Sequence, residues 1–284
     1  MTLLAILLAT LTAGIGSVWL AAGLMRLGLL AGSASGRNRV DPQHLLSLAA
    51  GALMATSFMH LLPEAFESQA GPKALFGTLL VGLVFFFLLD KAELWHHGHE
   101  HHQAPAGEAG GSSHGAAAAD HPHHGHHHHH PPADSRPGAW AVLTGDSVHC
   151  FGDGILIASA FVADLRLGLV AAVAVLAHEV PHHIGDLVVL RQSSNRSAAL
   201  LKVSLAGAVT ALGGLTGWWL VDQLHGYLPY FLVVASSSFI YVALADLIPQ
   251  LQKRLSARET LAQIFWLLVG IGLVTGVSTL MHSH

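Results

Sequence analysis

Long uninterrupted apolar segments constrain the fold of this 284-residue chain more than any other feature. Only 11% of its residues are charged, whereas soluble domains average roughly 25%. A helix needs about 20 apolar residues to cross a hydrocarbon core ~30 Å thick. Eight segments reach that length, at residues 2–30, 44–68, 74–95, 139–163, 166–190, 198–222, 228–252 and 259–281. The sequence therefore predicts a polytopic protein of the lipid bilayer.

Helices are the only secondary structure consistent with these segments. Backbone amides and carbonyls must be hydrogen-bonded inside the hydrocarbon, and only helices and closed barrels achieve this. The segments are too long for barrel strands and lack the polar and apolar alternation that such strands require. The first segment lacks a basic leader and exceeds the apolar core of a signal peptide, so we interpret it as a membrane helix. We predict one all-α transmembrane domain of eight helices covering residues 1–284.

The basic residues are distributed unevenly between the two sides of these helices. Eleven of the thirteen Lys and Arg residues lie in or beside the loops after the first, third, fifth and seventh segments. Cytoplasmic loops of membrane proteins carry an excess of these residues. The pattern predicts a multi-pass protein of a plasma or inner membrane, with the N- and C-termini non-cytoplasmic.

The loop at residues 96–138 contains fourteen of the 23 histidines. Its other residues are mostly Gly, Ala, Ser and Pro, which cannot build a packed core, so we expect a disordered cytoplasmic loop. A run of five histidines also occurs in affinity tags, but tags are normally terminal. We favour a native loop that binds Zn²⁺ loosely, as a buffer or sensor would. Its histidines include His96, His97, His99, His123, His124, His126, His127 and His128.

Metal-binding side chains are concentrated in the fourth and fifth segments. Ionisable groups cost roughly 2.5–3.5 kcal/mol each inside a membrane helix and usually mark a functional path. They are Asp146, His149, Cys150 and Asp153 in the fourth segment, and His178, Glu179, His182, His183 and Asp186 in the fifth. A structural hydrogen-bond network between the helices is the alternative explanation, and nine such residues argue against it.

Spacing and depth predict a shared metal site. His149 and Asp153 lie four residues apart, as do His178 and His182, so each pair shares one helix face. Both pairs fall about 15–18 Å from a helix end, near the bilayer midplane. Four ligands of mixed nitrogen and oxygen type, from these two pairs, suit tetrahedral Zn²⁺. A second ion would use Cys150 and Glu179 while sharing Asp153 and His182.

Prolines and a short internal similarity point to further transport residues. Pro63, Pro181 and Pro249 each remove a hydrogen bond within an apolar helix, so we expect the fifth helix to bend at its metal motif. The residues around Pro63 resemble those around Pro249, at helix ends predicted to lie on opposite membrane faces. Chance similarity and an inverted repeat remain equally open. A repeat would place His60 and Glu64 at the outer mouth and Asp246 at the inner one.

The segment HEVPH at residues 178–182 also matches the H-E-x-x-H motif of zinc proteases. An intramembrane metalloprotease is therefore the alternative function. Pro181 argues against it, because such enzymes need a regular helical turn between the two histidines. A catalytic zinc also keeps one position open for water, whereas the fourth segment offers further ligands. A cation-diffusion exporter is less compatible, since those proteins usually have six helices. Neither an enzyme activity nor a nucleic-acid partner is expected.

These residues resemble the ZIP family of divalent metal-ion transporters. One branch of that family has H-N-F-x-D-G in its fourth helix and H-E-x-P-H-E-x-G-D in its fifth. This sequence has HCFGDG at residues 149–154, HEVPHHIGD at residues 178–186 and the matching HLLPEA at residues 60–65. Three departures are Cys150 for Asn, His183 for Glu and Gln250 for an acid. The resemblance covers essentially the whole chain.

The resemblance implies a 3+2+3 helix arrangement with an inverted repeat and transport of zinc into the cytoplasm by alternating access. It implies metal ligands at His149, Asp153, His178, Glu179 and His182, with Cys150 as a sixth candidate. Such proteins commonly dimerise, so a homodimer is expected. Fe²⁺, Mn²⁺ and Cd²⁺ are alternative cargoes. A thiolate at Cys150 would favour Zn²⁺ over Mn²⁺ or Fe²⁺, although a small packing role is equally open.

Overall fold

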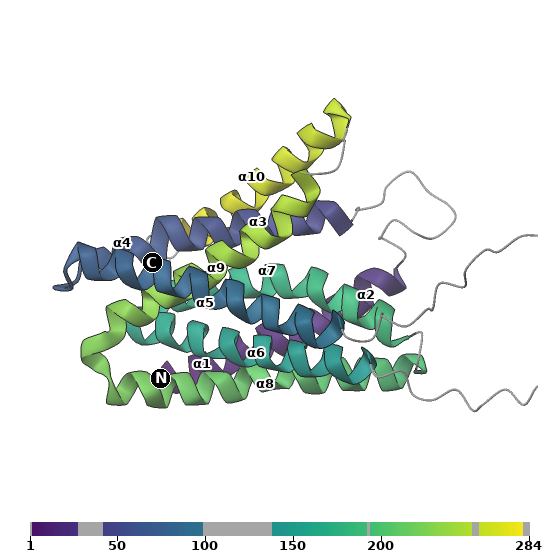
Figure 1. The fold of residues 1–284 in the computed structure, drawn as a ribbon, viewed down its shortest axis with the longest axis horizontal. Coiled ribbons are helices and arrows are strands. Elements are labelled where there is room, and N and C mark those ends of the chain that lie inside the picture. Colours follow the sequence, from purple (N-terminus) through teal and green to yellow (C-terminus); the bar gives the residue numbers. More distant parts are fainter. Residues whose placement is uncertain (1, 28–41, 99–137, 192–193, 252–255, 281–284) are drawn as a thin grey trace, which may run out of the picture.

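A computed structural model describes residues 2–27, 42–98, 138–191, 194–251 and 256–280. Eight of its helical spans are long and apolar enough to cross a membrane, which confirms the predicted polytopic fold. Figure 1 shows them as one bundle of roughly aligned helices, in which α9 and α10 run at an angle to the others. The elements are α1 (Thr2–Leu11), η1 (Thr12–Gly16), α2 (Ser17–Arg26), α3 (Pro42–Thr56), η2 (Ser57–Leu61), α4 (Leu62–Phe66), α5 (Pro72–Gly98), α6 (Gly138–Ala163), α7 (Leu165–Leu190), α8 (Arg196–Gln223), η3 (His225–Tyr227), α9 (Leu228–Leu251) and α10 (Ala257–Leu280).

The first two membrane spans each contain one π-helical turn. In the second span the turn precedes Pro63, whose missing amide removes a donor, and Leu62 N–H instead bonds to Ser57 O. The first span changes from α to π at Thr12 and returns to α at Ser17. The helix α7, by contrast, stays helical across Pro181. Of the two prolines, Pro63 therefore lies next to a change of helix type and Pro181 does not.

The helix contacts occur in related pairs. The first span packs against α7 as α8 packs against α6, and α3 packs against α10 as α9 packs against α5. Suppose that the first, second and third spans are replaced by α8, α9 and α10, and that α6 and α7 change places. Each of these contacts then becomes the other contact of its pair. The central pair α6 and α7 also packs together. The contacts therefore follow the 3+2+3 plan of an inverted repeat.

Glycines set the closest helix crossings around this centre. A Cβ at Gly14 would meet the backbone of Gly207, and one at Gly154 would meet the backbone of Thr210 and Gly213. Small residues let helices approach closely where lipid provides little hydrophobic drive for association. Gly154 belongs to the HCFGDG motif, so this motif combines metal-binding side chains with a packing contact. Gly154 packs α6 against α8, while the polar residues of the motif face α7.

Candidate metal centre

The antiparallel pair α6 and α7 positions the centre. Asp164 links them in an extended conformation and caps α7 by accepting hydrogen bonds from Arg166 N at 2.8 Å and Leu167 N at 3.4 Å. This tight turn brings the middle of α6 beside the middle of α7. His149 is the twelfth residue of α6, and His178 is the thirteenth residue counted back from the end of α7, so both lie roughly 18 Å along a helix.

Four of the predicted ligands converge on one point. One ligand atom from each of His149, Asp153, His178 and Glu179 lies within 4.8 Å of the others. His149 Nε2 is 3.3 Å from His178 Nε2 and 3.8 Å from Asp153 Oδ2. His178 Nε2 is 3.2 Å from Asp153 Oδ2. Glu179 Oε1 lies 3.6 Å from His149 Nε2 and 3.5 Å from His178 Nε2. We call these four residues the first cluster.

The spacing of these atoms matches the edges of a zinc tetrahedron. Nitrogen and oxygen ligands bind Zn²⁺ at 2.0–2.2 Å, so neighbouring ligand atoms in a tetrahedron stand about 3.3–3.6 Å apart. The five measured separations range from 3.2 to 3.8 Å. Hydrogen-bonded atoms lie at about 2.7–3.2 Å, and four of the five separations exceed that range, the exception being the 3.2 Å between His178 and Asp153. The first cluster therefore has the size of a metal site.

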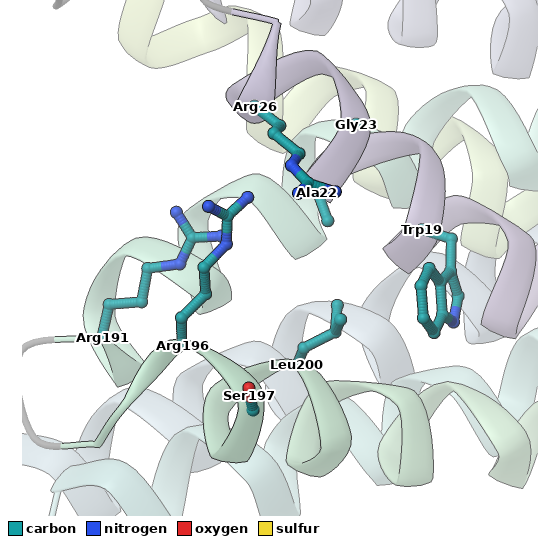
Figure 2. Close-up of a pocket in the computed structure, with 8 residues that line it drawn as sticks. All are labelled: Trp19, Ala22, Gly23, Arg26, Arg191, Arg196, Ser197 and Leu200. Carbon is teal, nitrogen blue, oxygen red and sulfur yellow. The ribbon is translucent and has the colours of Figure 1, made fainter.

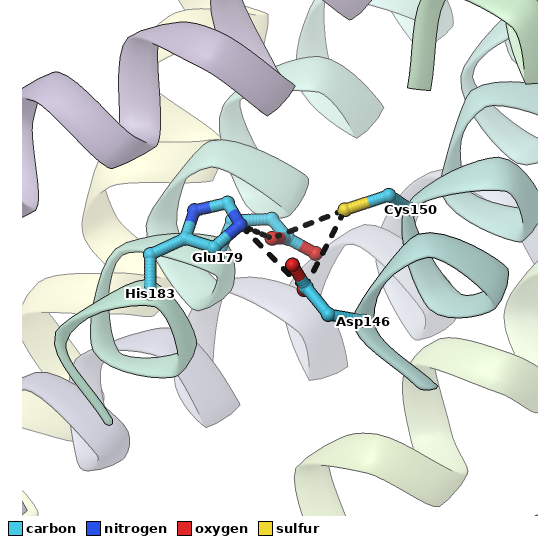
Figure 3. Close-up of side chains that lie close together, drawn as sticks. All are labelled: Asp146, Cys150, Glu179 and His183. Carbon is cyan, nitrogen blue, oxygen red and sulfur yellow. Dashed lines mark hydrogen bonds and ion pairs between the residues drawn. The ribbon is translucent and has the colours of Figure 1, made fainter. Parts of the chain in front are cut away.

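A second group of ligands lies one helical turn away and shares Glu179 (Figure 3). His183 Nε2 is 3.1 Å from Glu179 Oε2 and 3.6 Å from Asp146 Oδ1. Cys150 Sγ is 3.7 Å from Asp146 Oδ1 and 3.9 Å from Glu179 Oε2. The two oxygens of Glu179 thus face different groups. We call Asp146, Cys150, Glu179 and His183 the second cluster.

Hydrogen bonds away from the clusters fix two of the imidazoles. Ser17 Oγ donates to Gly14 O at 2.6 Å, so it accepts from His183 Nδ1 at 2.9 Å. His178 Nδ1 lies 3.4 Å from the carbonyl of Ala174, an acceptor only. Both contacts favour the tautomer that carries the proton on Nδ1, which leaves the lone pair of Nε2 facing a cluster. Such outer contacts orient histidine ligands in metal sites.

His182 and Asp186 lie on the wall of a cavity rather than in either cluster. The cavity has a volume of about 730 Å³, and its wall also includes His149, Asp153 and Asp146. The His182 ring centroid is 5.5 Å from that of His149 and 5.9 Å from that of His178. Of these two α7 histidines, His178 therefore belongs to the first cluster with His149, whereas His182 lines the cavity beside that cluster. The expected second ion paired Cys150 with Asp153 and His182, whereas the structure groups it with Asp146 and His183.

The remaining predicted residues lie away from the centre or outside the described part. His60 is in η2, where its Nδ1 lies 3.4 Å from the carbonyl of Ala55, and Glu64 is exposed in α4. The backbone of Asp246 belongs to α9, but its side chain is not described. His96 and His97 belong by backbone to the last turn of α5, and residues 99–137 lie outside the described residues. Their expected role in metal binding therefore stays a prediction.

Ser17 is the contributor that sequence reasoning missed. It is buried in the first span, which carries no ionisable group before Arg26. A serine between small residues in an apolar helix is common as a packing residue, so it gave little signal. The second cluster did have a signal, because Asp146 with Cys150 and Glu179 with His183 are both i,i+4 pairs.

Comparison with known proteins identifies the family. The family model "ZIP Zinc transporter" matches residues 2–278. Zinc transporter ZIP4 of Homo sapiens is 33% identical over 142 residues, covering 50% of this chain and 22% of that protein. The zinc transporter ZIP13 homolog of Drosophila melanogaster is 25% identical over 280 residues, covering 84% of this chain and 78% of the relative.

Longer relatives extend well beyond the matched region. Zinc transporter ZIP10 of Danio rerio is 33% identical over 144 residues, covering 48% of this chain and only 17% of that protein. The chain thus spans about a fifth of the length of two of these relatives. The match nevertheless runs through all eight membrane spans. With a family match over nearly its whole length, this chain belongs to the ZIP zinc transporter family.

Proposed function

We propose that this chain transports Zn²⁺ into the cytoplasm and that the first cluster is its transport site. The observation that carries the proposal is the convergence of four ligand atoms from two helices, at separations that suit a zinc ion. Asp153, His178 and Glu179 are almost completely buried, with 1–2% of their surface exposed. Carboxylates are costly in such surroundings unless a cation compensates them. A divalent ion bound between them supplies that compensation.

Unsatisfied polar atoms support a bound cation at both clusters. Asp153 Oδ2, Glu179 Oε1, Asp146 Oδ2 and His183 Nε2 are buried and have no hydrogen-bond partner among the described residues. Most buried polar side-chain atoms in proteins do have a partner, so four exceptions within two turns of helix need an explanation. Two ions, with Glu179 shared between them, would account for Asp153 Oδ2, Glu179 Oε1 and His183 Nε2. Asp146 faces the second cluster through its other oxygen, Oδ1. The chain therefore carries two ions at once or passes one ion between the clusters.

The cavity supports an exit toward the cytoplasm. Its wall is formed by the later parts of α5 and α9 and by the beginning of α6, including Phe85, Gly145 and Tyr241. These helix portions lie toward the end at which most Lys and Arg residues are found. On the other side of the clusters, Leu53, Ile157 and Phe239 are fully or almost fully buried in the main hydrophobic core. This arrangement supports an inward-open state, and alternating access would open the path past His60 and Glu64.

Uptake of Zn²⁺ into proteoliposomes tests the transport site. We expect Asp153→Ala and His178→Ala to abolish most of the uptake seen with the unaltered chain. His225→Ala is the matched control, because His225 is exposed in η3 and bonds only to the carbonyl of Asp222. Equal uptake by the unaltered chain and both site variants would show that the ion takes another path.

Direction requires a separate measurement. Zinc entry is followed in intact cells and in inside-out membrane vesicles that carry the same chain. The proposal expects zinc to accumulate in the cells when it is supplied outside, and to leave the vesicle lumen when it is loaded there. Accumulation inside inside-out vesicles alone would reverse the assigned direction without affecting the site assignment.

Asp246 and the histidine loop would receive the ion after the first cluster. Deleting residues 99–130 should preserve zinc uptake and alter its response to zinc on the cytoplasmic side. Asp246→Asn tests the inner mouth in the same assay. A homodimer and a cargo of Fe²⁺, Mn²⁺ or Cd²⁺ are compatible with this proposal. Uptake of Zn²⁺ in competition with each of these ions determines the preference.

A further inference from the structure

Three arginines from three different helical segments meet in one pocket at an end of the bundle. Arg26 is the last residue of α2, Arg191 follows α7 directly, and Arg196 begins α8. The pocket has a volume of about 340 Å³. Figure 2 shows the guanidinium groups of Arg191 and Arg196 side by side, directed toward the segment that carries Arg26. Arg191 lies eight residues beyond His183, about 12 Å along the helix, and none of the three arginines belongs to either cluster.

The pocket has a strong positive charge, and no counterion for it is found among the residues that the structure describes. Its lining consists of Trp19, Ala22, Gly23, Arg26, Arg191, Arg196, Ser197 and Leu200, and none of these residues is acidic. No ion pair involves the three arginines within the described part of the chain. Three like charges held together in this way repel one another unless an anion lies between them.

Arg191 shows the missing partner most clearly. Its Nε and Nη2 atoms are buried and have no hydrogen-bond partner among the described residues. Partial burial, together with the neighbouring charge of Arg196, lowers the pKa of Arg191 from its ordinary value. Arginine is retained at such sites where its planar group binds a carboxylate or phosphate through two parallel hydrogen bonds. The unpaired nitrogens therefore point to an anionic ligand of that geometry.

The start of α8 adds backbone donors to the same pocket. Asn195 caps this helix by accepting from Ala198 N at 2.8 Å. The earlier amides, at Arg196 and Ser197, have no acceptor within the helix, as in any helix start. Such amides and the helix dipole favour an anion beside them. Ser197 also lines the pocket, so its hydroxyl is an additional donor.

We propose that this pocket binds a phosphate group, held by Arg26, Arg191 and Arg196 at the membrane surface. The phosphate belongs either to the headgroup of an anionic phospholipid or to a soluble phosphate compound. A lipid fits the surroundings well, because Trp19 is 60% exposed beside the pocket and Leu200 forms part of its wall. Tryptophan is enriched where hydrocarbon meets headgroups. Either ligand would join the ends of α2, α7 and α8.

Ligand binding to the purified full-length chain tests the site directly. Native mass spectrometry counts the molecules of phosphatidylglycerol or phosphatidylcholine that the protein retains. Binding of inorganic phosphate is measured by its effect on the temperature of thermal unfolding. Arg191→Ala and Arg196→Ala should each weaken binding roughly tenfold or more, because each removes a charge-assisted contact. Arg191→Lys should weaken it less, since the charge remains and the paired donors are lost.

Arg258→Ala is the matched control. It removes one positive charge near the start of α10, where Arg258 is exposed and does not line the pocket. Retention of phosphatidylglycerol over phosphatidylcholine, lost in the pocket variants, supports a lipid headgroup. Stabilisation by inorganic phosphate, lost in the same variants, supports a soluble ligand. Arg196 is exposed, so Arg196→Ala should fold normally. The proposal is overturned if that variant binds phosphate and lipid as well as the unaltered chain, or if Arg258→Ala loses as much binding as the pocket variants. None of these readouts depends on zinc transport.

Discussion

Ser17 accepts a hydrogen bond from His183 across the interface between the first span and α7, at 2.9 Å. The serine proton is committed to the carbonyl of Gly14 at 2.6 Å, so the direction of the bond to His183 is fixed. Gly14 in turn lies against the backbone of Gly207 on α8. The second cluster is thereby connected through one hydroxyl to a helix crossing outside α6 and α7. A shift of the first span relative to α7 would change the orientation of a metal ligand.

Removing that hydroxyl should weaken metal binding without unfolding the protein. Loss of an outer contact to a metal ligand typically costs ten- to a hundredfold in affinity, so Ser17→Ala should raise the KM for Zn²⁺ by roughly that factor. Zinc uptake into proteoliposomes at varied zinc concentration measures it. Thr12→Val is the control, because the Thr12 hydroxyl is exposed and bonds only to Leu8 O. An unchanged KM in Ser17→Ala, or an equal change in Thr12→Val, would contradict the role assigned to Ser17.

Glu179 and Asp146 should differ in how many ions they affect. Glu179 faces both clusters, whereas Asp146 faces the second one only. If two ions bind, Asp146→Asn should remove one and Glu179→Gln should weaken both. Zinc retained per chain is measured by mass spectrometry of the purified variants. The loop histidines are the same in each variant, so differences report on the buried centre. Equal loss in the two variants would argue against a shared carboxylate.

Cys150 should determine how the centre treats soft metal ions. Its sulfur is fully buried and lies beside the carboxylates of Asp146 and Glu179. Thiolates favour soft ions, so Cys150→Ser should retain zinc uptake and reduce the ability of Cd²⁺ to compete with it. The measurement is the cadmium concentration that halves zinc uptake. Cys150→Ala leaves no ligand atom at this position, so its comparison with Cys150→Ser separates the loss of the sulfur from the loss of any ligand. Unaltered competition in both variants would favour a packing role for this residue.

Most residues of the first cluster were predictable from the sequence, whereas the grouping of Cys150 with Asp146 and His183 was not. His149 and Asp153 share a face by their spacing, and the connection before Arg166 is short enough to set the depth of α7. Spacing alone does not say which face of α7 turns toward α6. Packing decides that His183 is fully buried while His182 faces the cavity. The contribution of Ser17 depends on how the first span packs, which no local pattern specifies.

Two glycines of the HCFGDG motif should respond very differently to the same small substitution. A Cβ at Gly154 would collide with the backbone of α8 at Thr210 and Gly214, whereas a Cβ at Gly152 would meet nothing within 4 Å. Overpacking of a tight contact costs typically 1–3 kcal/mol, so Gly154→Ala should lower the thermal unfolding midpoint in detergent clearly. Gly152→Ala, two residues away, should leave it nearly unchanged. Because Asp153 lies between them, the pair also separates packing from chemistry: Gly154→Ala should reduce zinc uptake in proportion to the folded protein that remains. Equal midpoints for the two variants would mean that α8 does not pack against α6 through Gly154.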